Sequence, residues 1–316
     1  MDYIFSVRRV RQNAFDNEPG STYFLAVPGT ADDLLPNQAM GRPGQMPKTW
    51  RNAVMDDACP NHSGHGEIVF YVHGFNTTTQ NTLARHRLIK NGLRRQGFKG
   101  TVVSFDWPAA DKALNYLEDR TDAKETARRL VDDGIRVFAQ MQTPECGINL
   151  HIMAHSMGCY VVREAFDDAD DRRSIASTNW SVSQMLFVSA DVSAASMAAE
   201  NPKSASLYRH CMRLTNYANP YDGILSLSDV KRIGAAPRAG RVGLPQNAPQ
   251  KAVNVDVGAY YDENRVQFQD LEFPAHSWYF YDETFMRDAF CTITGEIDRN
   301  AIPTRTGIRN SLILEK

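Results

Sequence analysis

The residues with the clearest chemical potential lie at 154–158, which read Ala-His-Ser-Met-Gly. They follow an apolar run at 148–153 that predicts a buried strand, and they precede an apolar run at 159–162 that predicts a helix. A serine with small residues two places before and two places after it fits a tight turn, which holds its hydroxyl at the helix N-terminus. We therefore expect Ser156 to be a nucleophile for an acyl carbonyl, with Ala154 where such turns usually have glycine. The alternative role for this serine is capping the helix.

A second motif, His-Gly-Phe-Asn at 73–76, ends an earlier apolar run at 68–72. Attack on a carbonyl places negative charge on its oxygen, and two backbone N–H groups are the usual stabiliser. One N–H is expected from Met157, directly after the nucleophile, and the other from Phe75. The same motif is also compatible with a plain turn before a helix.

Together the two motifs, in this order, resemble the α/β-hydrolase superfamily. The sequence is similar in particular to a bacterial group of uncharacterised function, which carries His-Gly-Phe-Asn before a turn reading His-Ser-Met-Gly. The resemblance covers roughly residues 67–280. It implies an α/β-hydrolase fold and a catalytic triad, but no defined substrate.

A serine hydroxyl needs a base, and the superfamily order of nucleophile, acid and base implies that the base comes last. Two histidines follow Ser156, at positions 210 and 276. His210 directly precedes a predicted strand, so it is expected at the edge of the sheet opposite the site. His276 follows the last predicted strand and is the expected base.

Two aspartates could hold the base in place. Asp222 lies in a turn after the predicted strand at 212–217, and Asp191 follows the predicted strand at 184–190. We favour Asp222, because the superfamily usually places its acid one strand later than Asp191. Asp191 remains the alternative acid, and whichever residue is not used would stabilise a turn or a helix end.

The candidate site residues lie at the ends of predicted strands, in a chain whose segments alternate between strand and helix patterns. Strands are expected at 21–27, 68–72, 101–105, 148–153, 184–190, 212–217 and 252–257, and helices at 79–96, at 122–140 and from 156. This alternation predicts an α/β fold with a mostly parallel sheet and helices on both faces. Ligands of such sheets bind beyond the carboxyl ends of the strands, where the candidate residues lie.

We expect residues 1–316 to form a single α/β-hydrolase domain. Residues 1–66 would supply N-terminal strands and a long loop that is irregular over 31–65, and residues 67–290 would form the hydrolase core. Residues 108–122 are a candidate lid.

The substrate pocket has two candidate residues, Trp107 and Asn76, which follow predicted strands at the same edge of the sheet. Core packing is the alternative role for Trp107. His73 and His155 are expected to pack or to shape the loops beside the site.

Charge and composition exclude several other classes of protein. The formal net charge of −2 lacks the excess of basic residues that binding to nucleic acid requires. No apolar stretch is long enough for a transmembrane helix. The N-terminus lacks the pattern of a secretory signal, so a cytoplasmic location is expected. Five scattered cysteines indicate reduced thiols, and Cys59, His62 and His65 lack a fourth ligand at a zinc-site spacing. We expect no metal and no cofactor.

The resulting expectation is a serine hydrolase that acts on a small-molecule acyl substrate. Carboxylic esters are the leading substrate class, as in carboxylesterases and lipases. Thioesters and amides could react through the same acyl-enzyme. The alternative is a binding or scaffolding protein that keeps the fold and has lost catalysis, since a fold does not determine a function.

Overall fold

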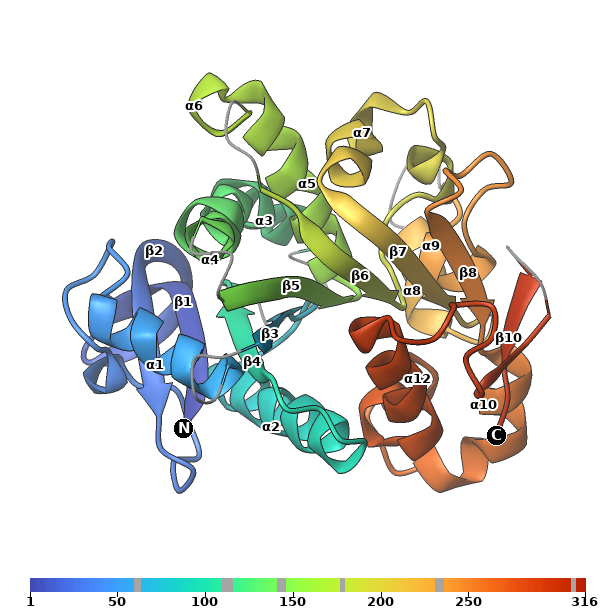
Figure 1. Ribbon diagram of the computed structural model, residues 1–316, viewed down its shortest axis with the longest axis horizontal. Coiled ribbons are helices and arrows are strands. Elements are labelled where there is room, and N and C mark those ends of the chain that lie inside the picture. Colours follow the sequence, from blue (N-terminus) through green and yellow to red (C-terminus); the bar gives the residue numbers. More distant parts are fainter. Residues whose placement is uncertain (60–63, 110–115, 141–145, 177–179, 231–235, 308–310) are drawn as a thin grey trace.

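The computed structural model describes residues 1–59, 64–109, 116–140, 146–176, 180–230, 236–307 and 311–316. Within these residues ten strands form one sheet, in the order β2-β1-β4-β3-β5-β6-β7-β8-β10-β9 (Figure 1). The strands are β1 (Asp2–Arg11), β2 (Ala14–Val27), β3 (Gly64–Val72), β4 (Thr101–Asp106), β5 (Cys146–His155), β6 (Val182–Val188), β7 (Cys211–Ala218), β8 (Ala252–Asp256), β9 (Arg305–Thr306) and β10 (Leu312–Leu314). The outermost pairs, β1 with β2 and β9 with β10, are antiparallel, and all other neighbours are parallel.

Helices cover both faces of the sheet, which confirms the α/β class predicted from the alternating pattern. The α-helices are α1 (Lys48–Ala58), α2 (Thr79–Arg95), α3 (Tyr116–Arg129), α4 (Arg136–Ala139), α5 (Met157–Asp171), α6 (Arg173–Ala176), α7 (Pro202–Arg209), α8 (Gly223–Val230), α9 (Ala239–Val242), α10 (Gly258–Asn264), α11 (Pro274–Ser277) and α12 (Glu283–Thr294). A π-helix, η4 (Leu130–Ile135), joins α3 to α4, and 3-10 helices form η1 (Pro36–Gln38), η5 (Ala194–Met197), η6 (Arg265–Phe268) and η7 (Trp278–Tyr281).

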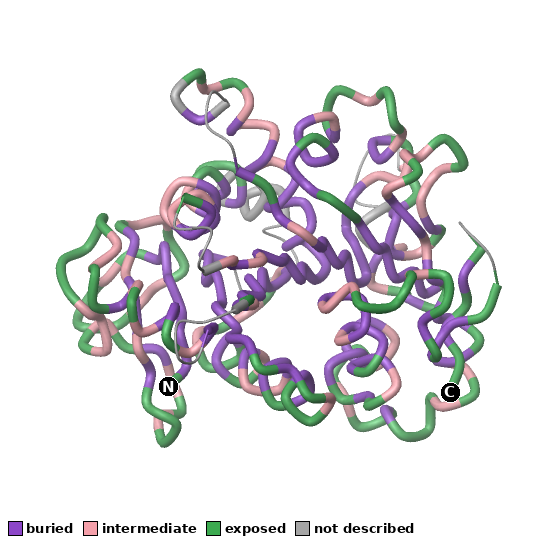
Figure 2. The backbone as a smooth tube through the Cα atoms, viewed as in Figure 1, coloured by how far each residue is buried: buried purple, intermediate pink, exposed green. Residues whose placement is uncertain are grey.

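The core has two main layers, one on each side of the sheet. Buried side chains of α1, α3, α5 and α7 form one cluster with the strands, and those of α2, α10 and α12 form the other. Figure 1 shows α3 and α5 on one side of the sheet and α2 and α12 on the opposite side. The central strands are buried between the layers, and all six residues of β4 are buried (Figure 2). Continuous apolar strands fit this position, because both of their faces are covered.

The parallel register brings the ends of the central strands to one edge of the sheet. Val72 of β3 pairs with Ala154 of β5, which in turn pairs with Phe187 of β6. Phe187 pairs with Asn216 of β7. Since these residues lie close to the carboxyl ends of their strands, the loops that follow β3, β5, β6 and β7 meet. These loops carry the sequence-predicted site residues.

The expectation of an irregular chain over residues 31–65 is wrong for Lys48–Ala58, which form α1. This helix starts after Pro47 without a side-chain cap, so its start carries no capping signal in the sequence. It is held in place by burial of Trp50 and Val54 against the sheet.

The candidate lid at 108–122 lies partly outside the described residues, which omit 110–115. Its last part belongs to α3, which begins at Tyr116 and packs against α5.

In the described ranges, no helix is both long enough and apolar enough to cross a membrane.

A buried ion pair ties the C-terminal strands to the core. Arg305 of β9 binds both carboxylate oxygens of Asp288 in α12, at 2.8 Å from Nε and 2.6 Å from Nη2. Both side chains are 0% exposed. The hydroxyl of Tyr217 in β7 also donates to Asp288, at 2.7 Å. One carboxylate therefore links α12, the sheet centre and the C-terminal edge.

Arg305→Met should lower the free energy of unfolding by about 3–5 kcal/mol, because it leaves the Asp288 carboxylate buried without its cation. Urea denaturation measures the change. Arg95→Met is the matched control, since Arg95 is 55% exposed in its pair with Glu283 and its loss should cost less than about 1 kcal/mol. Equal losses in the two variants would contradict a structural role for the buried pair.

Candidate active site

Ser156 lies between β5 and α5 in a backbone conformation that residues other than glycine rarely adopt, with φ 55° and ψ −126°. Its N–H donates to the carbonyl of Val188 at 3.0 Å, and its own carbonyl accepts from the N–H of Asp191 at 3.1 Å. A side chain at Gly158 would place its Cβ 2.4 Å from the carbonyl oxygen of Val72. The turn therefore needs glycine at this position, and it presents Ser156 at the end of the central strand.

The loop after β3 passes directly against this turn. A Cβ at Gly74 would lie 2.7 Å from Cβ of Ser156 and 3.3 Å from its Oγ. Phe75 and Asn76 line the same pocket as Ser156, and Asn76 turns the chain with φ 53°. Met157 begins α5, where the first N–H groups of a helix have no partner within the helix. The structure thus places Phe75 and Met157 beside the serine.

A buried ion pair supports this loop from behind. Nε of Arg8 in β1 lies 2.9 and 3.0 Å from the two carboxylate oxygens of Asp106, and both side chains are almost fully buried. Nη2 of Arg8 donates to the carbonyl of Thr77 at 2.8 Å, and Nε2 of His73 lies 3.3 Å from Asp106. Burial alone would raise the pKa of Asp106, but the charge of Arg8 and the contact with His73 lower it below its usual range. The ionised carboxylate therefore anchors both ends of the loop.

Trp107 packs behind this loop and is not part of the pocket wall. Its ring stacks on His73, with centroids 5.4 Å apart and an interplanar angle of 8°. Its Nε1 donates to the carbonyl of His73 at 2.9 Å, and the residue is 0% exposed. Of the two candidate pocket residues, the structure places only Asn76 in the lining.

His276 and Asp222 form a buried pair, with 2.7 Å between Nδ1 and Oδ2. The carboxylate also accepts from Oγ of Ser189 at 2.5 Å and from the N–H groups of Ile224 and Leu225 at 3.1 and 3.3 Å. Because a carboxylate only accepts hydrogen bonds, Nδ1 of the ring carries the proton. In the neutral ring Nε2 is then the basic nitrogen.

Asp191 has a different partner. Its Oδ1 lies 3.0 Å from Nε of Arg238, and both side chains are buried. It lines the pocket, and its backbone N–H supports Ser156. Of the two acids that the sequence left open, Asp222 is the one whose carboxylate contacts His276.

His155, next to Ser156, contacts the backbone of His276. Its Nε2 lies 2.8 Å from the carbonyl oxygen of His276, and the two rings are 4.6 Å apart. Burial, together with the charges of His276 and Arg85, lowers the pKa of His155 well below its usual value. The ring is therefore neutral near pH 7 and donates from Nε2 to that carbonyl.

His210, the other histidine that follows the serine, directly precedes β7 at the opposite edge of the sheet. Its Nδ1 lies 2.9 Å from the carbonyl oxygen of Trp180, and its Nε2 lies 2.8 Å from Asp170. Both ring nitrogens of His210 therefore contact groups of a separate buried cluster.

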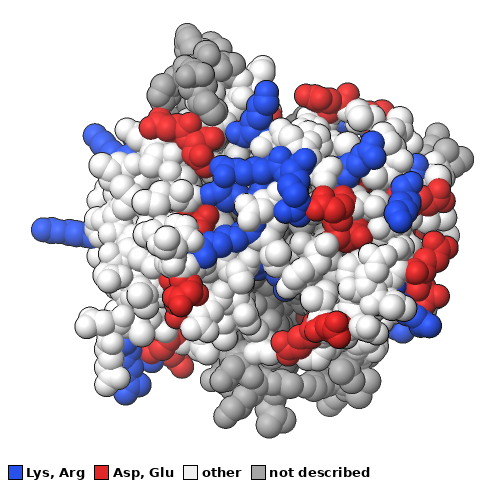
Figure 3. All heavy atoms as spheres, turned by 90° about the horizontal axis from the view of Figure 1, so that it is seen from below, with Lys and Arg blue, Asp and Glu red and all other residues white. Residues whose placement is uncertain are grey.

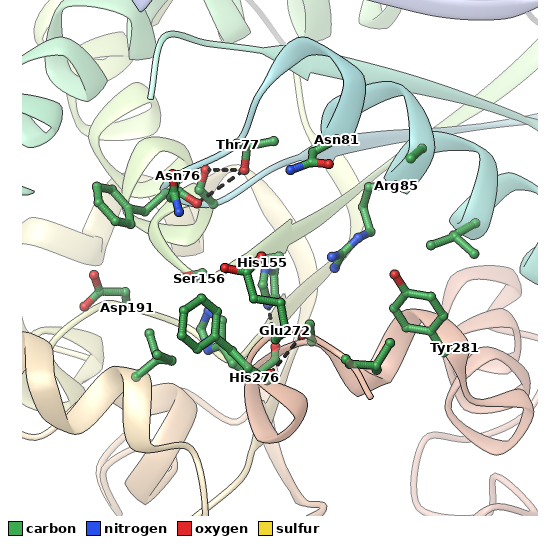
Figure 4. A pocket seen from close by; sticks show the side chains of 18 of the residues that line it. Asn76, Thr77, Asn81, Arg85, His155, Ser156, Asp191, Glu272, His276 and Tyr281 are labelled. Carbon is green, nitrogen blue, oxygen red and sulfur yellow. Dashed lines mark hydrogen bonds between the residues drawn. The ribbon is translucent and has the colours of Figure 1, made fainter. Parts of the chain in front are cut away.

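A pocket of about 470 Å³ opens at Ser156 and His276 (Figure 4). One wall is a single face of α2, with side chains at i, i+3, i+4 and i+7: Asn81, Ala84, Arg85 and Leu88. Facing parts of the lining come from α8 and from the segments around α11, namely Ile224, Leu225, Leu271, Glu272, Phe273 and Tyr281. Sequence reasoning did not single out these residues. The spacing on α2 was the available signal, but only the packing of α2 beside the loop makes that face a pocket wall.

Among the described residues, no group of three or more His, Cys, Asp or Glu side chains is arranged to hold a metal ion. Of the residues considered for a zinc site, Cys59 is buried, and His62 lies outside the described residues.

Several known proteins are similar to this chain in part. An uncharacterized protein of Nostoc sp. (strain PCC 7120) is 35% identical over 60 residues, which span 19% of this chain and 15% of that protein. Phospholipase PlaB from Legionella pneumophila in complex with thio-NAD is 12% identical with a TM-score of 0.36, and the match covers 77% of this chain and 65% of that one. Trichoderma reesei cutinase in complex with a phosphonate inhibitor is 15% identical with a TM-score of 0.32, over 76% and 78% of the two chains.

Residues 52–268 match a family described as an alpha/beta hydrolase of unknown function (DUF900). The match covers more than half of the chain and includes the loop after β3, Ser156 and Asp222, whereas Arg8 and His276 lie outside it. The chain therefore belongs to this α/β-hydrolase family of unknown function.

Proposed function

We propose that the protein is a serine hydrolase that cleaves carboxylic esters through an acyl-enzyme on Ser156. The contact between His276 and Asp222 is the main support, because it orients the ring and leaves Nε2 as a base at the same pocket as the serine. Thioesters and amides could react through the same groups.

In the proposed reaction, Oγ of Ser156 attacks the carbonyl carbon while Nε2 of His276 accepts the hydroxyl proton. Asp222 stabilises the imidazolium that forms. The backbone N–H groups of Phe75 and Met157 bind the developing oxyanion. When the intermediate collapses, the alcohol leaves with the proton from His276. Water then attacks the acyl-enzyme by the same route, which releases the acid and restores the serine.

Ser156→Ala should lower kcat for p-nitrophenyl butyrate by about six orders of magnitude, as removal of the nucleophile does in other triad enzymes. A fluorophosphonate probe followed by mass spectrometry of the modified peptide gives a second readout. The label should be found on Ser156 and not on Ser277, the other serine of the pocket. Unchanged hydrolysis by the alanine variant would refute the proposal.

Asp222→Asn should lower kcat by about 10⁴-fold, because an amide no longer holds the ring in the required tautomer. Asp191→Asn should retain activity to within about tenfold, since Asp191 contacts Arg238 and not His276. Hydrolysis rates are compared per mole of folded protein, with folding measured by urea denaturation. A greater loss in Asp191→Asn than in Asp222→Asn would assign the acid role to Asp191.

Gly74→Ala should lower kcat by about 100- to 1,000-fold, because the new Cβ would push the loop and its Phe75 N–H away from the serine. Gly29→Ala is a matched control, as a Cβ there meets no atom within 4 Å. Equal kcat values in the two variants would show that the oxyanion site does not involve this loop.

A further inference from the structure

Arg85 is the basic side chain that α2 contributes to the pocket. Figure 4 shows it extending from the helix into the pocket, toward His155. Its guanidinium lies over the ring of Phe280, 4.2 Å from the centroid, and 5.9 Å from that of Tyr281. Stacking on aromatic rings fixes the plane of the guanidinium but does not use its N–H groups, which lie in that plane.

The other basic side chains of α2 each have an acidic partner. These ion pairs are Arg87 with Asp2, Lys90 with Asp2, Arg94 with Asp57, and Arg95 with Glu283. In the described part of the chain, Arg85 has no carboxylate within 4.0 Å and no hydrogen-bond partner, and its Nη1 is buried. Arg85 thus differs from its neighbours in lacking a counter-ion.

The two acidic residues that line the pocket do not neutralise this charge. Asp191 is bound to Arg238, and Glu272 is exposed and forms no ion pair with Arg85 among the described residues. An arginine keeps its charge in a protein, and a half-buried charge without a partner is costly. Viewed from the side of α2 and α12, basic side chains gather over the middle of the face, with acidic groups around them (Figure 3). Of the basic side chains that α2 contributes, Arg85 is the one without an acidic partner in the described part of the chain, and a positive charge of this kind attracts anions.

We infer that Arg85 binds an anionic oxygen group of the substrate, a carboxylate or a phosphate ester, beside the ester that Ser156 attacks. The inference rests on the proposed function. A planar guanidinium can donate two parallel hydrogen bonds to such a group, and Ala84 and Leu88 next to it can contact the apolar part of the same molecule. The preferred substrate is thus an ester with both an apolar and an anionic part.

Two pairs of esters test this inference and distinguish the two anions. Mono-p-nitrophenyl glutarate and p-nitrophenyl pentanoate differ by a carboxylate on the acyl side. Para-acetoxyphenyl phosphate and para-methoxyphenyl acetate differ by a phosphate on the leaving group. In at least one pair the anionic ester should have a kcat/KM about 10- to 100-fold higher, the range expected for a charge-assisted hydrogen bond. Arg85→Gln should remove this preference, and Arg85→Lys should keep part of it.

Arg94→Gln is the matched control, because it removes an equal charge from an exposed site on the same helix outside the pocket lining. It should leave the preference intact. No preference for the anionic ester in either pair, or a preference that survives in Arg85→Gln, would overturn the inference.

The inference and the proposed function can fail separately. If no ester is hydrolysed and the fluorophosphonate does not label Ser156, the proposed function fails. Thermal unfolding with glutarate or phenyl phosphate then tests Arg85 directly. A rise in Tm that is lost in Arg85→Gln and retained in Arg94→Gln supports an anion site, and the absence of any rise overturns it.

Discussion

The buried carboxylate of Asp106 determines how the parts of the site are placed relative to one another. It lies at the end of β4 and binds Arg8 of β1 and Thr82 of α2, and Arg8 in turn holds the loop after β3. A buried charge is tolerated only with its partners in place, so these four elements are fixed together. The position of Phe75 beside the serine and of Arg85 in the pocket wall both depend on this carboxylate. The N-terminal strand therefore supports the site, although it lies outside the matched family segment.

Much of the candidate site could be located from the sequence because its signals are local. Ser156 and Phe75 each lie in a short motif after an apolar run, and the parallel sheet brings the ends of those runs together. His276 follows from chain order, which the resemblance supplied. Local patterns did not separate Asp222 from Asp191, since both follow predicted strands in similar turns, and the preference for Asp222 came from the strand order that the resemblance supplied. The structure separates them through their partners, and these partners are distant in the sequence.

The pocket wall, the α1 helix and the short C-terminal strands could not be predicted from the sequence in the same way. The α1 helix has no side-chain cap, and burial of Trp50 rather than local propensity holds it. The strands β9 and β10 have only two and three residues, too few to show alternation. Arg85 looks in the sequence like one of several solvated charges on a basic helix. Its significance appears only when the ion pairs of the neighbouring charges are known.

Four of the non-glycine residues with positive φ surround the site: Asn76, Ser156, Ser189 and Phe273. Each conformation of this kind costs on the order of 1–3 kcal/mol, which the rest of the fold must offset. Glycine would relieve this strain, but it would also loosen the segments that hold the proposed nucleophile, acid and base. Selection for heat resistance alone would therefore favour changes at these positions that work against activity. The most thermostable form of this protein and its most active form are expected to have different sequences around the pocket.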